Sequence, residues 1–196
     1  MSGAVAGPDG RLRCPWALSA PDYLDYHDTE WGRPVTSVPG LYERLTLEAF
    51  QSGLSWITIL RKREGFRRAF AGFDPAAVAA FDSADVERLL TDPGIVRNRG
   101  KIEAAIANAR VVTELGQAFA NLVLSYRVGE RARPTADDWH ATSPESVALS
   151  KALRKAGIRF VGPTTAYALM QAVGLVDDHL VDCWVPPYPW PTATPD

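Results

Sequence analysis

Residues 157–165 read Gly-Ile-Arg-Phe-Val-Gly-Pro-Thr-Thr, and this short stretch decides the fold of the chain. Gly157 suits the left-handed conformation that ends a helix, because glycine has no Cβ to clash. Gly162 removes a side chain where the next helix begins, and Pro163 suits the first helical position. Bare backbone N–H groups and the positive end of the helix dipole then face outward. That arrangement is typical of an anion site suited to a phosphate.

Two interpretations of this hairpin are open. One is a tight turn between two packed helices, and the other is a binding site for a phosphate, as in the helix-hairpin-helix element that holds a DNA backbone and that this hairpin resembles. Basic residues nearby favour the second interpretation: Lys151, Arg154, Lys155 and Arg159. The candidate backbone contacts are Gly162, Thr164, Arg159 and Lys155.

Helical periodicity extends outward from the hairpin through most of the chain. Capping residues such as Asp74 and Ser83 mark several of the helix starts. The predicted helices span residues of about 40–52, 55–71, 75–81, 84–90, 99–115, 118–126, 144–156 and 163–174. Alternating strand patterns are nearly absent and no internal repeat is detectable, so the predicted class is all-α.

Both ends of the chain have the composition of disordered tails. Residues 1–10 are small and glycine-rich, and residues 186–196 contain five prolines. The sequence therefore predicts one all-helical domain at 11–185, with its hairpin and flanking helices at about 144–174.

Composition bounds the function classes. The 196 residues are 46% hydrophobic and 22% charged, as in an ordinary soluble globular protein with a sizeable core. No apolar run approaches the ~20 residues that a membrane span needs, and residues 1–10 lack a secretory pattern. We therefore expect no membrane contact and a cytoplasmic location. The net charge of −2 does not indicate nucleic-acid binding, so such a function must rest on local patches.

A lone carboxylate, Glu48, lies in the otherwise apolar stretch at residues 47–56, Leu-Glu-Ala-Phe-Gln-Ser-Gly-Leu-Ser-Trp. Such a residue either points outward from an amphipathic helix or lines a pocket and binds a ligand. Periodicity alone favours the outward interpretation. Five aromatic residues in the first 56 positions shift the balance towards a receptacle for a flat, cationic or hydrogen-bonding ring: Trp16, Tyr23, Tyr26, Trp31 and Trp56.

Cysteine and histidine form a further pattern at the two ends of the chain. Cys14 and His27 lie near the start, and His179 and Cys183 near the end. Two nitrogen and two sulfur ligands suit a closed, tetrahedral, structural zinc site, with His179 and Cys183 expected one helical turn apart. The alternatives are four unrelated residues with inert thiols, or a Cys14–Cys183 disulfide, which a cytoplasmic location disfavours.

Several motifs occur together and in order. They are Arg13-Cys14-Pro15-Trp16, Tyr26-His27-Asp28-Thr29-Glu30-Trp31-Gly32, Leu47-Glu48, Gln51-Ser52-Gly53-Leu54-Ser55-Trp56-Ile57-Thr58, Arg97-Asn98-Arg99-Gly100-Lys101-Ile102, Phe160-Val161-Gly162-Pro163-Thr164-Thr165, and Asp178-His179 with Cys183. Over roughly residues 11–185 the chain resembles the 3-methyladenine DNA glycosylase I family of the helix-hairpin-helix DNA glycosylase superfamily. One departure is Phe50, where that family suggests a small or polar residue.

The resemblance implies a helix-hairpin-helix fold with one structural Zn²⁺ joining the two ends, bound by Cys14, His27, His179 and Cys183. It also implies a base pocket that maps to Glu48 as the catalytic carboxylate, with Tyr26 and Trp56 against the base and Trp16, Tyr23 and Trp31 close by. The expected state is a monomer.

The implied reaction is base-excision repair of alkylated double-stranded DNA. The enzyme flips 3-methyladenine out of the duplex and hydrolyses its N-glycosidic bond, which leaves an abasic site without strand cleavage. The implied product is free 3-methyladenine.

Three alternatives are weighed against this interpretation. Asp178 lies at about the distance after the hairpin where many related glycosylases carry a catalytic aspartate, but its neighbour His179 restricts its direction, so Glu48 is favoured. A non-catalytic, zinc-stabilised helix-hairpin-helix module would bind DNA without releasing a base. A zinc hydrolase would need an open coordination position on the metal, and four protein ligands would occupy all the positions of a tetrahedral zinc.

Overall fold

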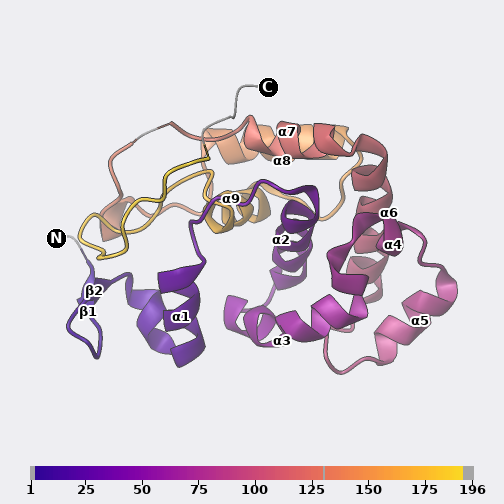
Figure 1. Cartoon of the computed structure of the whole chain (residues 1–196), viewed down its shortest axis with the longest axis horizontal. Coiled ribbons are helices and arrows are strands. Elements are labelled where there is room, and N and C mark those ends of the chain that lie inside the picture. The colour runs from indigo at the N-terminus through magenta and orange to yellow at the C-terminus, as the bar shows by residue number, and fades with distance from the viewer. Residues whose placement is uncertain (1–2, 130, 192–196) are drawn as a thin grey trace.

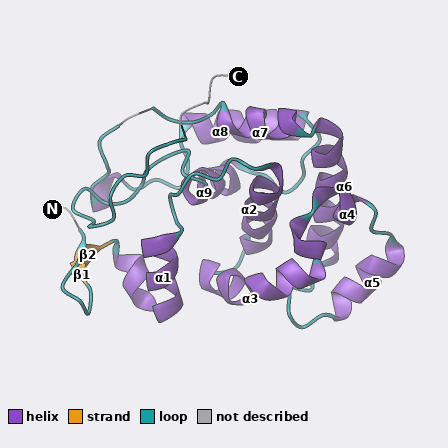
Figure 2. Ribbon diagram, in the orientation of Figure 1, coloured by secondary structure: helices purple, strands orange, loops and turns teal. Residues whose placement is uncertain are grey.

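The computed structural model describes residues 3–129 and 131–191, and this part of the chain is mostly helical (Figures 1 and 2). The α-helices are α1 Pro21–Thr29, α2 Val38–Gln51, α3 Trp56–Ala69, α4 Pro75–Ala79, α5 Ser83–Thr91, α6 Arg99–Leu115, α7 Gln117–Leu124, α8 Pro144–Lys155 and α9 Pro163–Ala172. Three short 3₁₀ helices are η1 Pro15–Ser19, η2 Ala71–Phe73 and η3 Ala136–Asp138. Two-residue strands β1 Val5–Ala6 and β2 Leu12–Arg13 pair antiparallel.

Side-chain caps fix several helix starts close to their predicted positions. Ser37 accepts from Gly40 N–H at α2, and Asn98 accepts from Lys101 N–H at α6. Ser143 caps α8 as predicted, whereas α5 is capped by Asp82, and the predicted cap Ser83 is its first helical residue. Each cap satisfies backbone donors that the first helical turn leaves free, so short polar residues decide where these helices begin.

The hydrophobic core surrounds α2, which packs against α3, α6 and α9. Tyr42 is fully buried on α2 and donates its hydroxyl to Ala105 O on α6 at 3.0 Å. Phe50 is also fully buried, with its ring 4.7 Å from that of Phe66 on α3. The unexpected size at position 50 therefore fills the core.

The hairpin between α8 and α9 has the predicted geometry at its first glycine. Gly157 has φ +99°, the left-handed conformation that ends α8. Asn108 on α6 holds the loop: Arg159 N–H donates to Asn108 Oδ1 at 2.7 Å, and Asn108 Nδ2 donates to Arg159 O at 3.1 Å. The side chain of one α6 residue thus fixes the hairpin to the body of the protein.

The predicted disordered tail at 1–10 is wrong for residues 5–10, which form β1 and the turn of the β1–β2 hairpin. Asp9 accepts from Arg13 at 2.6 Å, and Arg13 also pairs with Asp28 of α1 at 2.8 Å. Residues 1–2 lie outside the described residues. Because the hairpin is fixed by a partner distant in the sequence, local composition does not reveal it.

The C-terminal segment is likewise packed over residues 186–191, which differs from the predicted tail. Trp190 donates its indole N–H to Gly174 O at 3.0 Å, and Arg127 lies 4.9 Å from the Trp190 ring centre. Residues 192–196 fall outside the described ranges. A proline-rich composition therefore does not by itself prevent docking here.

Two further points concern the described helices. Periodicity does not single out α1, because only Tyr26 and His27 on it are buried. No helix of the described residues is long and apolar enough to cross a membrane.

Candidate functional site

A cavity of about 420 Å³ brings together all six side chains predicted to bind or act on a base. Those six are Trp16, Tyr23, Tyr26, Trp31, Glu48 and Trp56. The remaining lining residues were not predicted: Gln51, Trp139, His140, Ala141, Ala168 and Gln171. Gln51 lies three positions after Glu48 on one helix and so on the same face, and this spacing could have predicted it as a lining residue. The other five depend on long-range folding.

The cavity walls are fixed by helix geometry. Tyr23 and Tyr26 lie three positions apart on α1, and Trp56 is the first residue of α3. The Ile57 N–H donates to the Tyr23 hydroxyl at 2.7 Å, which joins α1 to the start of α3. This bond sets the position of the Trp56 ring relative to the α1 tyrosines.

The aromatic walls support one another. Trp16 packs edge-on against Tyr23 with ring centres 5.4 Å apart, and against Trp31 at 5.1 Å. The rings of Tyr26 and Trp56 lie 5.5 Å apart at 46°. Such contacts stabilise the rings at about 0.5–1.5 kcal/mol per pair. The walls are therefore already in place before a ligand enters.

Glu48 is the buried carboxyl of the cavity, with an exposed fraction of only 5%. Burial raises its pKa to about 8, and the charge of Arg44 offsets only part of that effect. Arg44 itself pairs with Glu30 at 2.6 Å. Within the described residues no donor bonds to the Glu48 carboxyl, so near pH 7 it is mostly protonated. A cation in the cavity would favour its ionised form.

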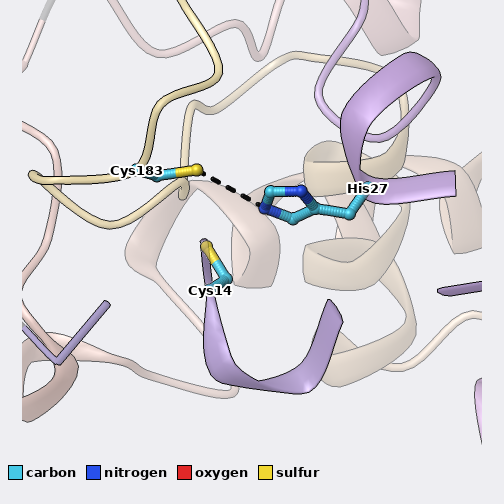
Figure 3. A group of neighbouring side chains, drawn as sticks. All are labelled: Cys14, His27 and Cys183. Carbon is cyan, nitrogen blue, oxygen red and sulfur yellow. Dashed lines mark hydrogen bonds between the residues drawn. The ribbon is translucent and has the colours of Figure 1, made fainter. Parts of the chain in front are cut away.

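A second cluster brings together Cys14, His27 and Cys183, whose ligand atoms all lie within 4.8 Å of one another (Figure 3). Cys183 Sγ is 3.5 Å from His27 Nε2. The hydrogen bond from Cys14, with a smaller contribution from His27, lowers the pKa of Cys183 against the effect of burial. A thiolate is the form of cysteine that binds a metal.

The fourth predicted ligand, His179, lies beside this cluster. Its ring centre is 5.0 Å from that of His27, and its buried Nε2 has no hydrogen-bond partner among the described residues. A buried, unpartnered nitrogen is costly unless something binds it. The segment 179–183 is not helical, so the expected spacing of one helical turn is wrong. An irregular turn places His179 and Cys183 instead.

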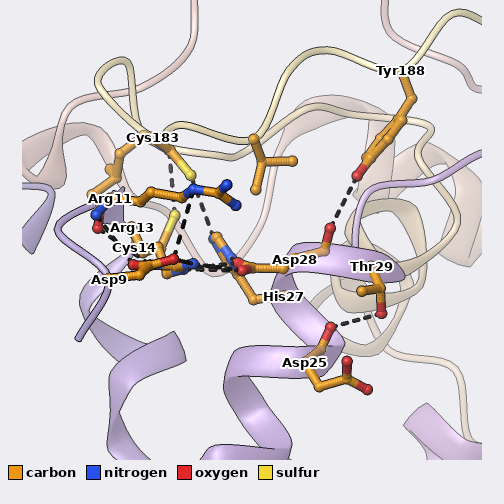
Figure 4. Close-up of polar contacts among 12 residues, drawn as sticks. Asp9, Arg11, Arg13, Cys14, Asp25, His27, Asp28, Thr29, Cys183 and Tyr188 are labelled. Atoms are coloured by element: carbon orange, nitrogen blue, oxygen red, sulfur yellow. Dashed lines mark hydrogen bonds and ion pairs between the residues drawn. The ribbon is translucent and has the colours of Figure 1, made fainter. Parts of the chain in front are cut away.

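Carboxylates orient both histidines of the cluster. Asp28 contacts His27 Nδ1 at 2.8 Å, and Asp177 contacts His179 Nδ1 at 2.9 Å. This leaves Nε2 of each ring for a metal, as in many carboxylate–histidine–zinc arrangements. Arg13 holds Asp28 in place, and Figure 4 shows this network reaching Asp9. Two sulfur and two nitrogen donors with these partners fit a tetrahedral structural zinc.

The candidate backbone contacts lie on one exposed hairpin. Lys155, Arg159 and Thr164 are exposed, and Gly162 begins α9 without a side-chain cap. Ser150 Oγ and Arg154 Nε both donate to Val161 O, at 2.8 and 2.9 Å. Within the described part of the chain, the N–H groups of Gly162 and Thr164 donate to no acceptor, so they can bind an anion.

Asp178 is 3% exposed, and its carboxylate is fully engaged. Tyr167 and Gln171 donate to Oδ2 at 2.6 and 2.7 Å, and Arg131 pairs with Oδ1. Asp178 does not line the cavity. Its surroundings indicate a structural role.

Comparison with known proteins gives consistent results. A family model described as methyladenine glycosylase matches residues 16–186. The chain is 48% identical to DNA-3-methyladenine glycosylase 1 of Escherichia coli strain K12 over 178 residues, or 87% of this chain and 95% of that protein.

Solved structures agree in fold. A crystal structure of 3-methyladenine DNA glycosylase I has a TM-score of 0.84 at 46% identity, covering 90% of this chain and 100% of that one. A variant of 3-methyladenine DNA glycosylase I solved in complex with 3-methyladenine gives 0.83 at 36% identity, covering 90% and 99%. Since the family model spans most of the sequence and the Escherichia coli relative is 48% identical over 95% of its length, this chain belongs to the methyladenine glycosylase family.

Proposed function

We propose that the protein is a base-excision repair enzyme that removes 3-methyladenine from alkylated DNA by hydrolysing its N-glycosidic bond. Membership of the methyladenine glycosylase family supports this activity. The observation that carries it in the structure is the buried carboxyl of Glu48 within a cavity of aromatic walls. That cavity suits a flat base turned out of the duplex.

The charge of the lesion explains how ordinary adenine is rejected. A methyl group on N3 leaves the adenine ring positively charged, so the ring gains ~0.5–2 kcal/mol over an aromatic face that neutral adenine does not gain. Its entry favours ionised Glu48, which accepts from the exocyclic amine. Tyr26 and Trp56 supply stacking surfaces worth ~1–3 kcal/mol per base.

The same charge explains why little acid catalysis is required. The cationic base departs with the bonding electrons of the C1′–N9 bond and is neutral once released. Water adds its oxygen to C1′ and loses a proton, which leaves an abasic site. No lysine nucleophile takes part, so the strand stays intact.

The hairpin holds the DNA backbone in this proposal. The free N–H groups at Gly162 and Thr164 bind a phosphate, and Arg159 and Lys155 add positive charge. These contacts are independent of sequence, as a repair enzyme requires. The substrate is double-stranded DNA and the enzyme acts as a monomer.

The metal is structural in this proposal. One zinc would be bound by Cys14, His27, His179 and Cys183, and it would link the N-terminal and C-terminal segments of the domain. Residues 11–185 form one glycosylase domain, with the helix-hairpin-helix at about 144–174. Residues 3–10 and 186–191 pack onto it.

Methylated duplex DNA tests the proposal directly. The purified protein should release 3-methyladenine, detected by chromatography of the free bases, and leave alkali-labile abasic sites in uncut strands. Glu48→Gln, which keeps the shape of the side chain, is the matched variant. DNA binding without any released base would instead support a non-catalytic DNA-binding module.

A further inference from the structure

We propose that Trp139 is an additional base-binding residue, whose indole forms a wall of the cavity and stacks on the flipped base. This inference rests on the proposed glycosylase function. Trp139 comes from the segment between α7 and α8, far in sequence from the aromatic residues of α1 and α3. It lines the same cavity as Glu48 and Trp56.

Trp139 differs from the other aromatic residues of the cavity in its surroundings. Its exposed fraction is 38%, whereas those of Tyr26 and Trp31 are 4% and 8%. Trp16, Tyr23, Tyr26, Trp31 and Trp56 pack against one another, but among the described residues no aromatic ring pairs with Trp139. An exposed indole at a cavity contributes little to the core, so its ring surface is free for a ligand.

The ring is nevertheless held in a defined position. The indole N–H of Trp139 donates to Asp178 O at 3.3 Å. Just before it, Asp138 Oδ2 accepts from both Thr135 N–H at 3.0 Å and Thr135 Oγ1 at 2.6 Å, which closes a tight turn. An anchored aromatic ring loses little conformational entropy when a base stacks on it.

The segment 131–139 is held by contacts with residues 177–181. Arg131 pairs with Asp178, and Arg133 pairs with Asp177 at 2.8 Å. Val181 N–H donates to Pro134 O at 3.0 Å. Asp178 therefore acts on the cavity indirectly: its carbonyl holds the Trp139 indole, and its carboxylate holds Arg131 and the lining residue Gln171.

Two substitutions of Trp139 distinguish the contribution of its aromatic face from that of its hydrogen bond to Asp178 O. Trp139→Phe keeps an aromatic face but loses the hydrogen bond to Asp178 O, whereas Trp139→Ala loses both. Calorimetric titration with free 3-methyladenine measures affinity for each, and thermal unfolding checks the fold. We expect Trp139→Ala to bind about 5- to 150-fold more weakly, the equivalent of one stacked ring, and Trp139→Phe to keep most of the affinity.

Trp184→Ala is the matched control, because Trp184 is 36% exposed and lies outside the cavity, 4.1 Å from the Arg11 guanidinium. Its affinity for 3-methyladenine should equal that of the wild type. The inference is overturned if Trp139→Ala binds as tightly as the wild type, or if Trp139→Phe falls as far as Trp139→Ala. A wild type that neither binds 3-methyladenine nor excises it overturns the proposed function, and this inference with it.

Discussion

At the scale of single residues, Glu48 carries the clearest consequence for activity. Glu48→Gln keeps the side-chain shape but replaces an acceptor for the base amine with a donor. Losing a charge-assisted hydrogen bond of ~1.5–3 kcal/mol predicts excision that is roughly 10- to 150-fold slower above pH 8. Single-turnover excision of 3-methyladenine measures it.

The pH profile of kcat/KM provides the control for that prediction. This parameter reports the free enzyme, in which the pKa of Glu48 is about 8, so the wild-type value should rise with pH up to that point. Glu48→Gln should lack this rise, and the two proteins should converge as the pH falls. A variant that retains the same alkaline rise would show that another group titrates.

The ionisation of Glu48 should also affect stability. Whereas kcat/KM should rise with pH, the free energy of unfolding should fall. The folded pKa of Glu48, about 8, exceeds its ordinary value of 4.5, so the stabilisation from the protonated form is complete below 4.5 and is lost as the pH rises towards 8. Each pKa unit corresponds to about 1.4 kcal/mol. Between pH 5 and 8 the wild-type Tm should fall relative to that of Glu48→Gln, as followed by circular dichroism. Parallel Tm curves would contradict this.

Asp178 should behave differently from Glu48. Asp178→Asn replaces one carboxylate oxygen with an NH₂ group. Tyr167, Gln171 and Arg131 all donate to the carboxylate, so at least one of these donors then faces another donor. We expect a loss of about 1–3 kcal/mol in the free energy of unfolding, with a smaller effect on excision than that of Glu48→Gln. A folded but inactive Asp178→Asn, beside an active Glu48→Gln, would reverse the two assignments.

At the scale of elements, the start of α9 is tested by Gly162→Asp. A Cβ at Gly162 meets only Arg154 Nη2, at 3.7 Å, and aspartate is a favourable N-cap, so the fold should persist. The new negative charge lies where the phosphate binds, so affinity for damaged and undamaged duplex should fall together. Fluorescence anisotropy at two salt concentrations measures both. Gly162→Asn, similar in shape but uncharged, should retain more affinity, and lost selectivity with unchanged general affinity would contradict the assignment.

Elements with local signals were predictable from the sequence. Ser143 and Asn98 cap their helices through neighbours three positions away, and Gly157 ends α8 by its own backbone conformation. The β1–β2 hairpin depends instead on Arg13 meeting Asp28, and Trp139 reaches the cavity through contacts with Asp178. Such long-range partners leave no periodic pattern. The candidate site was therefore predictable only where its residues share a short segment or a family motif.

At the scale of the whole molecule, the metal cluster should govern stability. The purified protein should contain about one zinc per chain, because binding free energy at such a site is also folding free energy. Cys183→Ala should lose the metal and unfold at a lower temperature, as measured by atomic absorption and calorimetry. Chelation of wild-type zinc should lower the Tm in the same direction. A metal-free wild type as stable as its variant would rule out the site.

The cluster of Cys14, His27, His179 and Cys183 has a mechanical consequence. Leu180 N–H donates to Cys14 Sγ across 166 positions of sequence. Figure 3 shows Cys14 and Cys183, from the two ends of the domain, next to one another in the cluster. A force that pulls the chain apart at Cys14 and Cys183 therefore loads this cluster before it loads the helices between them, because the two ligand atoms lie within 4.8 Å of one another. Pulled at these two residues, the segment 14–183 behaves as a closed loop until the cluster opens.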